Sequence, residues 1–324
     1  MTTVTMTESA NDSAAVPPSP APIRWWSMLG AVGLATQAVV LGRWLADGSW
    51  RLTNRPVSPP HLGDPALTTA FTLCYAPVVV ALAVWVVRGC WRERRLTFAA
   101  LVMLTAPLGM WLDLVGAWLR PVFAYYKDDP LAIRSWFPAL PGWRGGDQPA
   151  TNLPPQALLA YLSMPLFFLI MRQAMRLTAG RWPHAGRRRL AAAALAAGVV
   201  CGAGVMITGV VVRMFAFVDT IPALTLFYGS RFQYPAYDAV FLGASFAVFG
   251  MLWYHQDSDG LTAIERGADR FRPWARPWLR LLAMAGAIQL AVGCYGLTHL
   301  LASLAASPAP PALVTPVLST WALS

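Results

Sequence analysis

Residues 105–143 read TAPLGMWLDLVGAWLRPVFAYYKDDPLAIRSWFPALPGW, and they begin inside an apolar stretch that is long enough to cross a bilayer. The stretch carries Asp113, the one carboxylate that lies firmly inside a predicted membrane span, and it continues as a loop rich in aromatic residues and proline. An acidic residue near the centre of a membrane helix costs about 2.5–3.5 kcal/mol on insertion scales and usually faces a polar interior. Asp113 is therefore the first candidate for a chemical role.

The whole chain has the composition of a membrane protein. Of its 324 residues, 56% are hydrophobic and 12% are charged, whereas a soluble domain carries roughly 25% charged residues. We predict an all-α polytopic membrane protein with a single membrane domain, residues 25–304, between a disordered N-terminal tail (1–24) and a C-terminal tail (305–324). Seven apolar stretches are long enough to span a bilayer: residues 27–46, 66–88, 97–119, 156–177, 190–212, 236–254 and 280–304.

The net charge of +10 comes from arginines in short loops between these stretches, which indicates membrane topology rather than binding to nucleic acid. Three alternate loops hold 15 of the 25 basic residues: Arg88, Arg92, Arg94 and Arg95; Arg172, Arg176, Arg181 and Arg187–Arg189; and Arg266, Arg270, Arg272, Arg276 and Arg280. Because positive loops stay in the cytoplasm, we expect a cell-membrane protein with a cytoplasmic N-terminus. Loops 120–155 and 213–235, both rich in aromatic residues, would then lie outside and cap the helices.

Polar side chains within the spans gather in the expected outer half. They are Tyr75, Tyr161, Arg213, Tyr237, Asp238, Tyr295 and His299. Tyr295 and His299 are four residues apart and share a helix face. This bias predicts a polar pocket that opens outward, with Asp113 near its floor. The alternative role for Asp113 is a structural ion pair with Arg120 or Arg213 that locks helices together.

Motifs for many kinds of chemistry are missing from the sequence. It contains no Walker loop, no GxGxxG after a strand, no HExxH, no GxSxG and no zinc-spaced cluster of cysteine and histidine. The four histidines and four cysteines are scattered, so we expect no metal and no cofactor. The chemistry that remains needs only acids, bases and a shaped apolar pocket.

Three segments resemble the AveC-type spirocyclase family, integral membrane proteins of actinobacteria that are named for spiroketal formation in polyketide antibiotic biosynthesis. They are Trp111–Asp113 followed by Pro121, Tyr125 and Tyr126; the loop end Ser135–Trp143; and the run Tyr234–Phe271 with its motif Glu265-Arg266-Gly267-Ala268-Asp269. Together they cover roughly half of the chain. One position departs from the family pattern as we know it, because Ala117 stands where an asparagine often follows the acid by one helical turn.

The resemblance implies that a hydrophobic dihydroxy-ketone polyketide closes to a spiroketal with loss of water. A protonated acid must help a hemiketal hydroxyl to leave, and an acceptor must take the proton of the attacking hydroxyl. Desolvation in an apolar wall favours the protonated form of a carboxyl group. We predict Asp113 as the acid and Asp238 or His299 as the acceptor. Residues predicted to bind the substrate or hold charges in register are Arg120, Tyr125, Tyr126, Trp136, Trp143, Arg213 and Tyr237.

Other hypotheses remain open at this stage. The substrate is made in the cytoplasm, so it either reaches the outer pocket sideways from the lipid bilayer or meets an inner-face site at Glu265, Arg266 and Asp269. The family activity can include a further dehydration. A transporter of a lipophilic polyketide would need polar residues along both halves of a pore. A scaffold for the polyketide synthase machinery would not need Asp113 at all.

Overall fold

The computed structural model describes residues 21–48, 65–117, 122–125, 136, 139–140 and 155–307. Helices dominate this part of the chain, and five of them are long and apolar enough to cross a membrane. These are α1 (Pro22–Ala46), α2 (Pro65–Glu93), α6 (Arg187–Val211), α7 (Ala236–Tyr254) and α8 (Arg276–Ser303). The prediction of a helical membrane protein is confirmed at this level, although α1 begins inside the predicted N-terminal tail.

The predicted span 97–119 is not one regular helix. It consists of α3 (Phe98–Thr105) and a 3₁₀ helix, η1 (Ala106–Ala117), which carries Asp113. Pro107 explains the change, because it lacks the backbone N–H that an α-helix would direct to the carbonyl of Met103. Long 3₁₀ segments are uncommon and often mark functional or strained sites.

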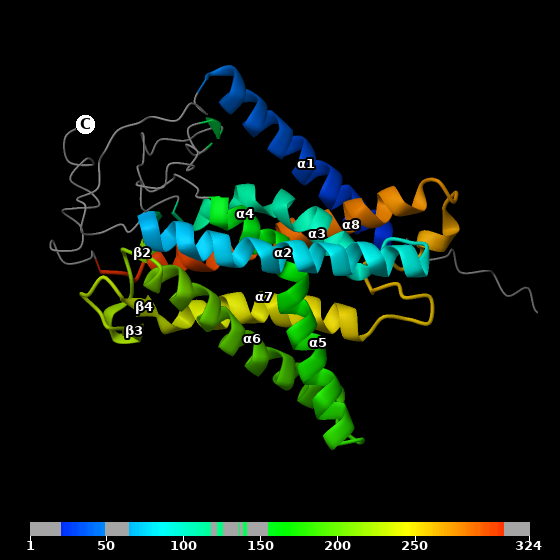
Figure 1. The fold of residues 1–324 in the computed structure, drawn as a ribbon. Helices are drawn as coiled ribbons and strands as arrows, with labels where there is room; N and C mark the ends of the chain where they lie inside the picture. Colours follow the sequence, from blue (N-terminus) through cyan, green and yellow to red (C-terminus); the bar gives the residue numbers. More distant parts are fainter. Residues whose placement is uncertain are drawn as a thin grey trace, which may run out of the picture.

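The predicted span 156–177 is also interrupted. It divides at Ser163 into α4 (Pro155–Leu162) and α5 (Met164–Arg181). Pro165 cannot continue the hydrogen-bond ladder, and the Ser163 hydroxyl instead donates to the carbonyl oxygen of Ala160 at 2.7 Å and contacts the hydroxyl of Tyr75. In Figure 1, α2 and α7 run across the view, and α5 crosses them steeply.

Short strands gather at one end of the bundle, called here the strand end (Figure 1). β1 (Phe123–Tyr125) pairs antiparallel with β2 (Phe215–Phe217), so the two loops predicted to cap the helices are joined. β3 (Thr225–Leu226) pairs with β4 (Tyr234–Pro235), after the short 3₁₀ helix η4 (Pro222–Leu224). The all-α prediction is corrected by these strands, which are too short to show a periodic pattern in the sequence.

A buried glutamine and a backbone contact after α8 hold the strand end together. The side chain of Gln233 is fully buried, and its Nε2 donates to the carbonyl oxygens of Phe217 at 2.6 Å and Val218 at 3.1 Å. The amide of Ser307, just after α8, donates to the carbonyl oxygen of Thr220 at 3.1 Å. The loop after β2 is thereby held against the last helix.

The opposite end, called here the arginine end, contains the segments 92–97, 181–189 and 255–275. There a guanidinium nitrogen of Arg95 donates to the carbonyl oxygen of Asp259, and the amide of Ile23 donates to that of Arg266 at 3.3 Å. The 3₁₀ helix η5 (Ala268–Arg270) lies in the same region. The segment 255–275 is therefore tied both to α1 and to the segment that contains Arg95.

Helices α6 and α7 approach each other closely through glycine. A Cβ added to Gly198 would lie 2.3 Å from the carbonyl oxygen of Gly243, and one added to Gly243 would lie 2.5 Å from the amide nitrogen of Val199. Small residues let membrane helices pack at short range, which compensates for the weak hydrophobic drive between helices in lipid. This contact holds α7, and with it Asp238, in place.

We expect Gly243→Val to destabilise the protein by about 1–3 kcal/mol, the usual cost of overpacking. Its Cβ would meet backbone atoms of α6, which cannot move aside as a flexible side chain would. The matched control is Gly42→Val, because no atom lies within 4 Å of a Cβ added at Gly42. Thermal unfolding of the detergent-purified proteins measures both. Equal midpoints for the two variants would show that the glycine contact does not matter.

Candidate functional site

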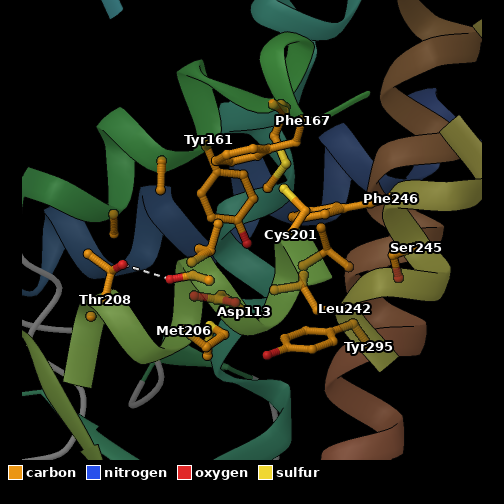
Figure 2. Close-up of a pocket in the computed structure, with 18 of the residues that line it drawn as sticks. Asp113, Tyr161, Phe167, Cys201, Met206, Thr208, Leu242, Ser245, Phe246 and Tyr295 are labelled. Atoms are coloured by element: carbon orange, nitrogen blue, oxygen red, sulfur yellow. Dashed lines mark hydrogen bonds between the residues drawn. The ribbon is translucent and has the colours of Figure 1, made fainter. Parts of the chain in front are cut away.

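A cavity of about 490 Å³ lies inside the bundle, among α2, η1, α4, α5, α6, α7 and α8. Small-molecule sites in proteins usually measure roughly 300–1,000 Å³. Aromatic and aliphatic side chains form most of its wall (Figure 2). The polar side chains of the wall are Tyr75, Asp113, Tyr161, Thr208, Ser245 and Tyr295. The cavity therefore suits a largely apolar ligand that carries a few oxygen atoms.

Asp113 lines this cavity and is half-buried there. Close packing of η1 on α8 places it: a Cβ added to Gly116 would lie 2.9 Å from the Cβ of His299 and 3.3 Å from the carbonyl oxygen of Gly296. Only glycine permits this approach. It brings the segment with Asp113 against the helix that carries Tyr295 and His299.

Two tyrosines share the part of the cavity that Asp113 faces. Figure 2 shows the hydroxyl groups of Tyr161 and Tyr295 pointing toward the region of Asp113, and all three residues line the cavity. Tyr161 and Tyr295 are 7% and 8% exposed, so both residues are largely buried. A carboxyl group and two hydroxyls thus form one polar region of a largely apolar chamber.

Asp238 lies at the centre of a buried hydrogen-bonded cluster next to the cavity. Its Oδ1 accepts from the hydroxyl of Tyr295 at 2.7 Å and lies 2.9 Å from Nε2 of His299. Its Oδ2 accepts from the hydroxyl of Tyr234 at 3.3 Å. Asp238 and His299 are both 0% exposed. Buried polar groups are stable when they are hydrogen-bonded, and here three partners surround one carboxyl group.

Tyr295 connects this cluster to the cavity. Asp238 and His299 do not belong to the cavity wall, whereas Tyr295 does. The ring centroids of Tyr295 and His299 are 4.7 Å apart, in an edge arrangement. Within this cluster, Tyr295 is therefore the residue that a ligand in the cavity can contact.

Tyr234 closes the cluster on the side of the strands. Burial raises the pKa of Tyr234, and the neighbouring Asp238 raises it further. Its hydroxyl consequently stays protonated and remains a donor to Asp238. The adjacent Gln233, bonded to the β2 backbone, fixes the chain at this point. The strand end thus supports the cluster as well as covering the helices.

Other residues predicted for the pocket lie elsewhere. Trp136 is buried outside the cavity wall, where its Nε1 donates to the carbonyl oxygen of Trp111 at 2.9 Å and its ring meets Trp44 edge-on. Tyr237 is half-buried with its ring 6.3 Å from that of His299, and it does not line the cavity. Arg213, just after α6, is half-buried with a left-handed φ of 59° and also lies outside the wall.

Several predicted residues cannot be compared with the cavity. Tyr125 is described through its backbone only, as the last residue of β1. Three more fall outside the described residues: Arg120, Tyr126 and Trp143. Their predicted roles remain predictions.

The alternative inner-face site, at the arginine end, is a network of structural contacts. Glu265 is fully buried, and its Oε1 accepts from Nε of Arg280 at 2.7 Å. Its Oε2 accepts from the amide of Thr262 at 3.0 Å and from the Thr262 hydroxyl at 2.6 Å. Arg266 and Asp269 are exposed. These contacts fold the loop onto α8, and none of the three predicted residues lines the cavity.

Two cavity residues, Tyr161 and Tyr295, were not assigned a role from sequence. Both belong to the set of polar residues in the expected outer half of the spans, and Tyr295 lies one helical turn before His299. That spacing is the signal that could have identified Tyr295, because it places both side chains on the face that meets Asp238. Tyr161 carries no comparable signal, since tyrosines are common near membrane surfaces.

Residues 93–318, more than half of the chain, match the family described as Spirocyclase AveC-like. The chain belongs to the AveC-like spirocyclase family. Comparison with curated proteins and with solved structures gave no match. The part of the chain that matches contains Asp113, Asp238, Tyr295 and His299, so both the acid in the cavity wall and the buried cluster lie within the family region.

Proposed function

We propose that this spirocyclase closes a dihydroxy-ketone polyketide to a spiroketal inside the cavity, by acid–base catalysis that needs no cofactor. The observation that carries the proposal is that a carboxylic acid and a tyrosine bonded to a second carboxyl group line the same cavity. Asp113 and the Tyr295 hydroxyl face the same apolar chamber, and Tyr295 is bonded to the buried Asp238. An acid and a separate acceptor are what a dehydrative cyclisation requires.

Asp113 is the acid in this proposal. In its protonated form it donates a proton to the hydroxyl of a cyclic hemiketal, the carbon–oxygen bond breaks, and water leaves. An oxocarbenium-like carbon remains. The position of Asp113 supports this role, because its side chain lines the chamber in which the substrate would bind.

Tyr295 and Asp238 form the acceptor. The second hydroxyl of the substrate attacks the oxocarbenium carbon, forms the new carbon–oxygen bond and passes its proton to the Tyr295 oxygen, while the Tyr295 proton moves to Asp238 across 2.7 Å. His299 and Tyr234 hold the carboxyl group of Asp238 in position. Nε2 of His299 lies 2.9 Å from Oδ1 of Asp238, and the Tyr234 hydroxyl donates to Oδ2. The reaction releases one water and no net proton, so the proton on Asp238 returns to Asp113 before the next turnover.

The cavity wall would control stereochemistry. Spiroketals can form without enzymes, so the specific contribution of the protein is to present one face of the planar oxocarbenium to the attacking hydroxyl. Close aromatic packing in the wall, such as Phe168 stacked on Phe249 with ring centroids 4.7 Å apart, gives the cavity a fixed shape. A cavity of fixed shape would bind the flexible substrate in one conformation.

The proposed enzyme crosses the cell membrane seven times with its N-terminus in the cytoplasm. In this arrangement the interrupted pairs α3–η1 and α4–α5 cross together with the five long helices. The contacts at the two bundle ends support it. Arg95, just before α3, contacts Asp259 at the arginine end, whereas β1, just after η1, pairs with β2 at the strand end.

The proposal is tested with membranes from a host that expresses the chain, incubated with a synthetic dihydroxy ketone. We expect one spiroketal stereoisomer to form in excess over membranes without the chain, as measured by chiral chromatography. A mixture of isomers equal to that of the control membranes would contradict the proposal.

Tyr295→Phe tests the acceptor. We expect kcat to fall by about a hundredfold, within the range of general acid–base contributions, while KM changes little. The phenyl ring keeps its packing, but the proton path from the cavity to Asp238 is lost. Tyr254→Phe, at the arginine end of α7, removes a hydroxyl outside the cavity wall and serves as the matched control. An unchanged kcat in Tyr295→Phe would remove this residue from the mechanism.

A further inference from the structure

We infer that the cavity opens sideways into the lipid bilayer between α2 and α6, and that lipophilic substrates enter through this opening. The inference rests on the proposed function for the identity of the substrate, but the opening itself follows from the geometry of two helices. It would let a membrane-dissolved polyketide reach Asp113 without passing through water.

The exposed part of the cavity wall lies on α6. Gly204 and Thr208, one helical turn apart, line the cavity and are exposed. No atom lies within 4 Å of a Cβ added at Gly204, so the space in front of this glycine is open. Both residues belong to a helix long and apolar enough to cross a membrane, so surface exposed there faces lipid rather than water.

Helix α2 forms the other side of the opening. Phe71 and Tyr75 line the cavity from α2 and are half-buried. The hydroxyl of Thr68 donates to the carbonyl oxygen of Val212 at 3.2 Å, which joins the two helices near the strand end. α2 begins and α6 ends at this point, so the helices are antiparallel.

The residues of the opening lie at similar distances from the Thr68–Val212 bond, measured along each of the two helices. Seven residues beyond Thr68 lies Tyr75, about 10 Å along α2 at a rise of 1.5 Å per residue. The same distance back from Val212 along α6 reaches the turn between Gly204 and Thr208. The Thr68–Val212 bond therefore closes the opening at the strand end, and the aromatic side chains of α2 face the small residues of α6.

The chemistry of the opening fits a lipophilic guest. Its sides are two aromatic rings, a glycine and a threonine whose hydroxyl is already bonded to the carbonyl oxygen of Gly204 at 2.7 Å. None of these four residues carries a charge, so an apolar chain passes without stripping water from an ion. Asp113 lies inside, so the substrate meets the acid after it has left the lipid.

The test uses Gly204→Trp and Gly42→Trp in liposomes. Neither glycine has a neighbouring atom within 4 Å of an added Cβ, so neither site blocks the start of a larger side chain, but only Gly204 lines the cavity. Binding is measured with a long-chain aliphatic ketone that carries a diazirine, dissolved in the lipid and activated by light. Mass spectrometry then identifies the labelled residues.

We expect the wild-type cavity to be labelled, including α2 near Phe71 and α6 near Gly204. Labelling of the inner wall should become at least about tenfold slower in Gly204→Trp and stay unchanged in Gly42→Trp, in line with the span of about one to three decades over which association rates vary among mutants of one binding interface. Thr208→Trp provides a second blocking variant in case Gly204→Trp does not fold. Equal labelling of the inner wall in all variants would overturn the inference.

Labelling also separates the opening from the proposed reaction, because it needs no turnover. If Gly204→Trp blocks labelling but the wild-type protein closes no dihydroxy ketone, the lipid-side opening stands and the cyclase proposal fails. If the wild-type protein converts the dihydroxy ketone to the spiroketal and Gly204→Trp is labelled as fast as the wild type, the cyclase proposal stands and the opening fails.

Discussion

Asp113→Asn is expected to lower the rate of stereoselective closure by about a hundredfold to ten-thousandfold, the usual span for loss of a general acid. Asparagine has nearly the same shape, so the packing of η1 on α8 through Gly116 is retained. It cannot donate a proton of comparable acidity to the departing hydroxyl. The measurement is the excess of one spiroketal isomer over the uncatalysed background, in membranes with equal amounts of folded protein.

The competing inner-face hypothesis predicts the opposite result. If the reaction occurred at the arginine end, Asp269→Asn would abolish closure and Asp113→Asn would leave it intact. The two non-catalytic alternatives, a transporter or a scaffold, predict no excess of one isomer even with the wild-type protein. Thermal unfolding accompanies the assay, because a lost ion pair of Asp113 would lower the unfolding midpoint rather than the rate per folded molecule.

Arg280→Met is expected to destabilise the protein by about 3–5 kcal/mol, because it leaves the fully buried Glu265 without its ion-pair partner. The double variant Arg280→Met with Glu265→Leu should recover much of this loss, since apolar residues can replace a buried pair at little cost. Unfolding of the purified protein in detergent by heat measures both variants.

A surface pair of the same type supplies the control for Arg280. Arg95 and Glu93 form an ion pair at 3.0 Å with side chains that are 42% and 48% exposed. Exposed pairs contribute only about 0–1 kcal/mol, so Glu93→Gln should change the unfolding midpoint little. If Arg280→Met were no more harmful than Glu93→Gln, the buried pair would not hold the loop at the arginine end.

Composition and the distribution of arginines were enough to predict helices that cross a membrane, because a bilayer demands long apolar segments. The interruptions within two of the predicted spans were not predicted. Pro107 and Pro165 were visible in the sequence, but prolines are tolerated in membrane helices when neighbouring groups satisfy the backbone. Whether they are tolerated depends on partners such as Tyr75 and Ser163, which come from separate helices.

The candidate site was predictable in part for a similar reason. A lone acid in an apolar stretch is conspicuous, so Asp113 was found directly. Asp238 and His299 were predicted as alternative acceptors, and the structure joins them in one cluster. Trp136 was predicted to line the pocket, but its direction depends on the carbonyl oxygen of Trp111, which is 25 positions away in sequence. Such a contact leaves no local pattern.

The pairing of β1 with β2 has a consequence for engineering the substrate range of the proposed cyclase. Phe123 is opposite Phe217 and Tyr125 is opposite Phe215, so each of the two loops supplies half of one small ribbon. A loop transplanted alone from a related cyclase would arrive without its matching half. The two loops should therefore be exchanged together. Chimaeras that receive both loops should keep the β1–β2 pairing, whereas chimaeras that receive only one loop should lose it.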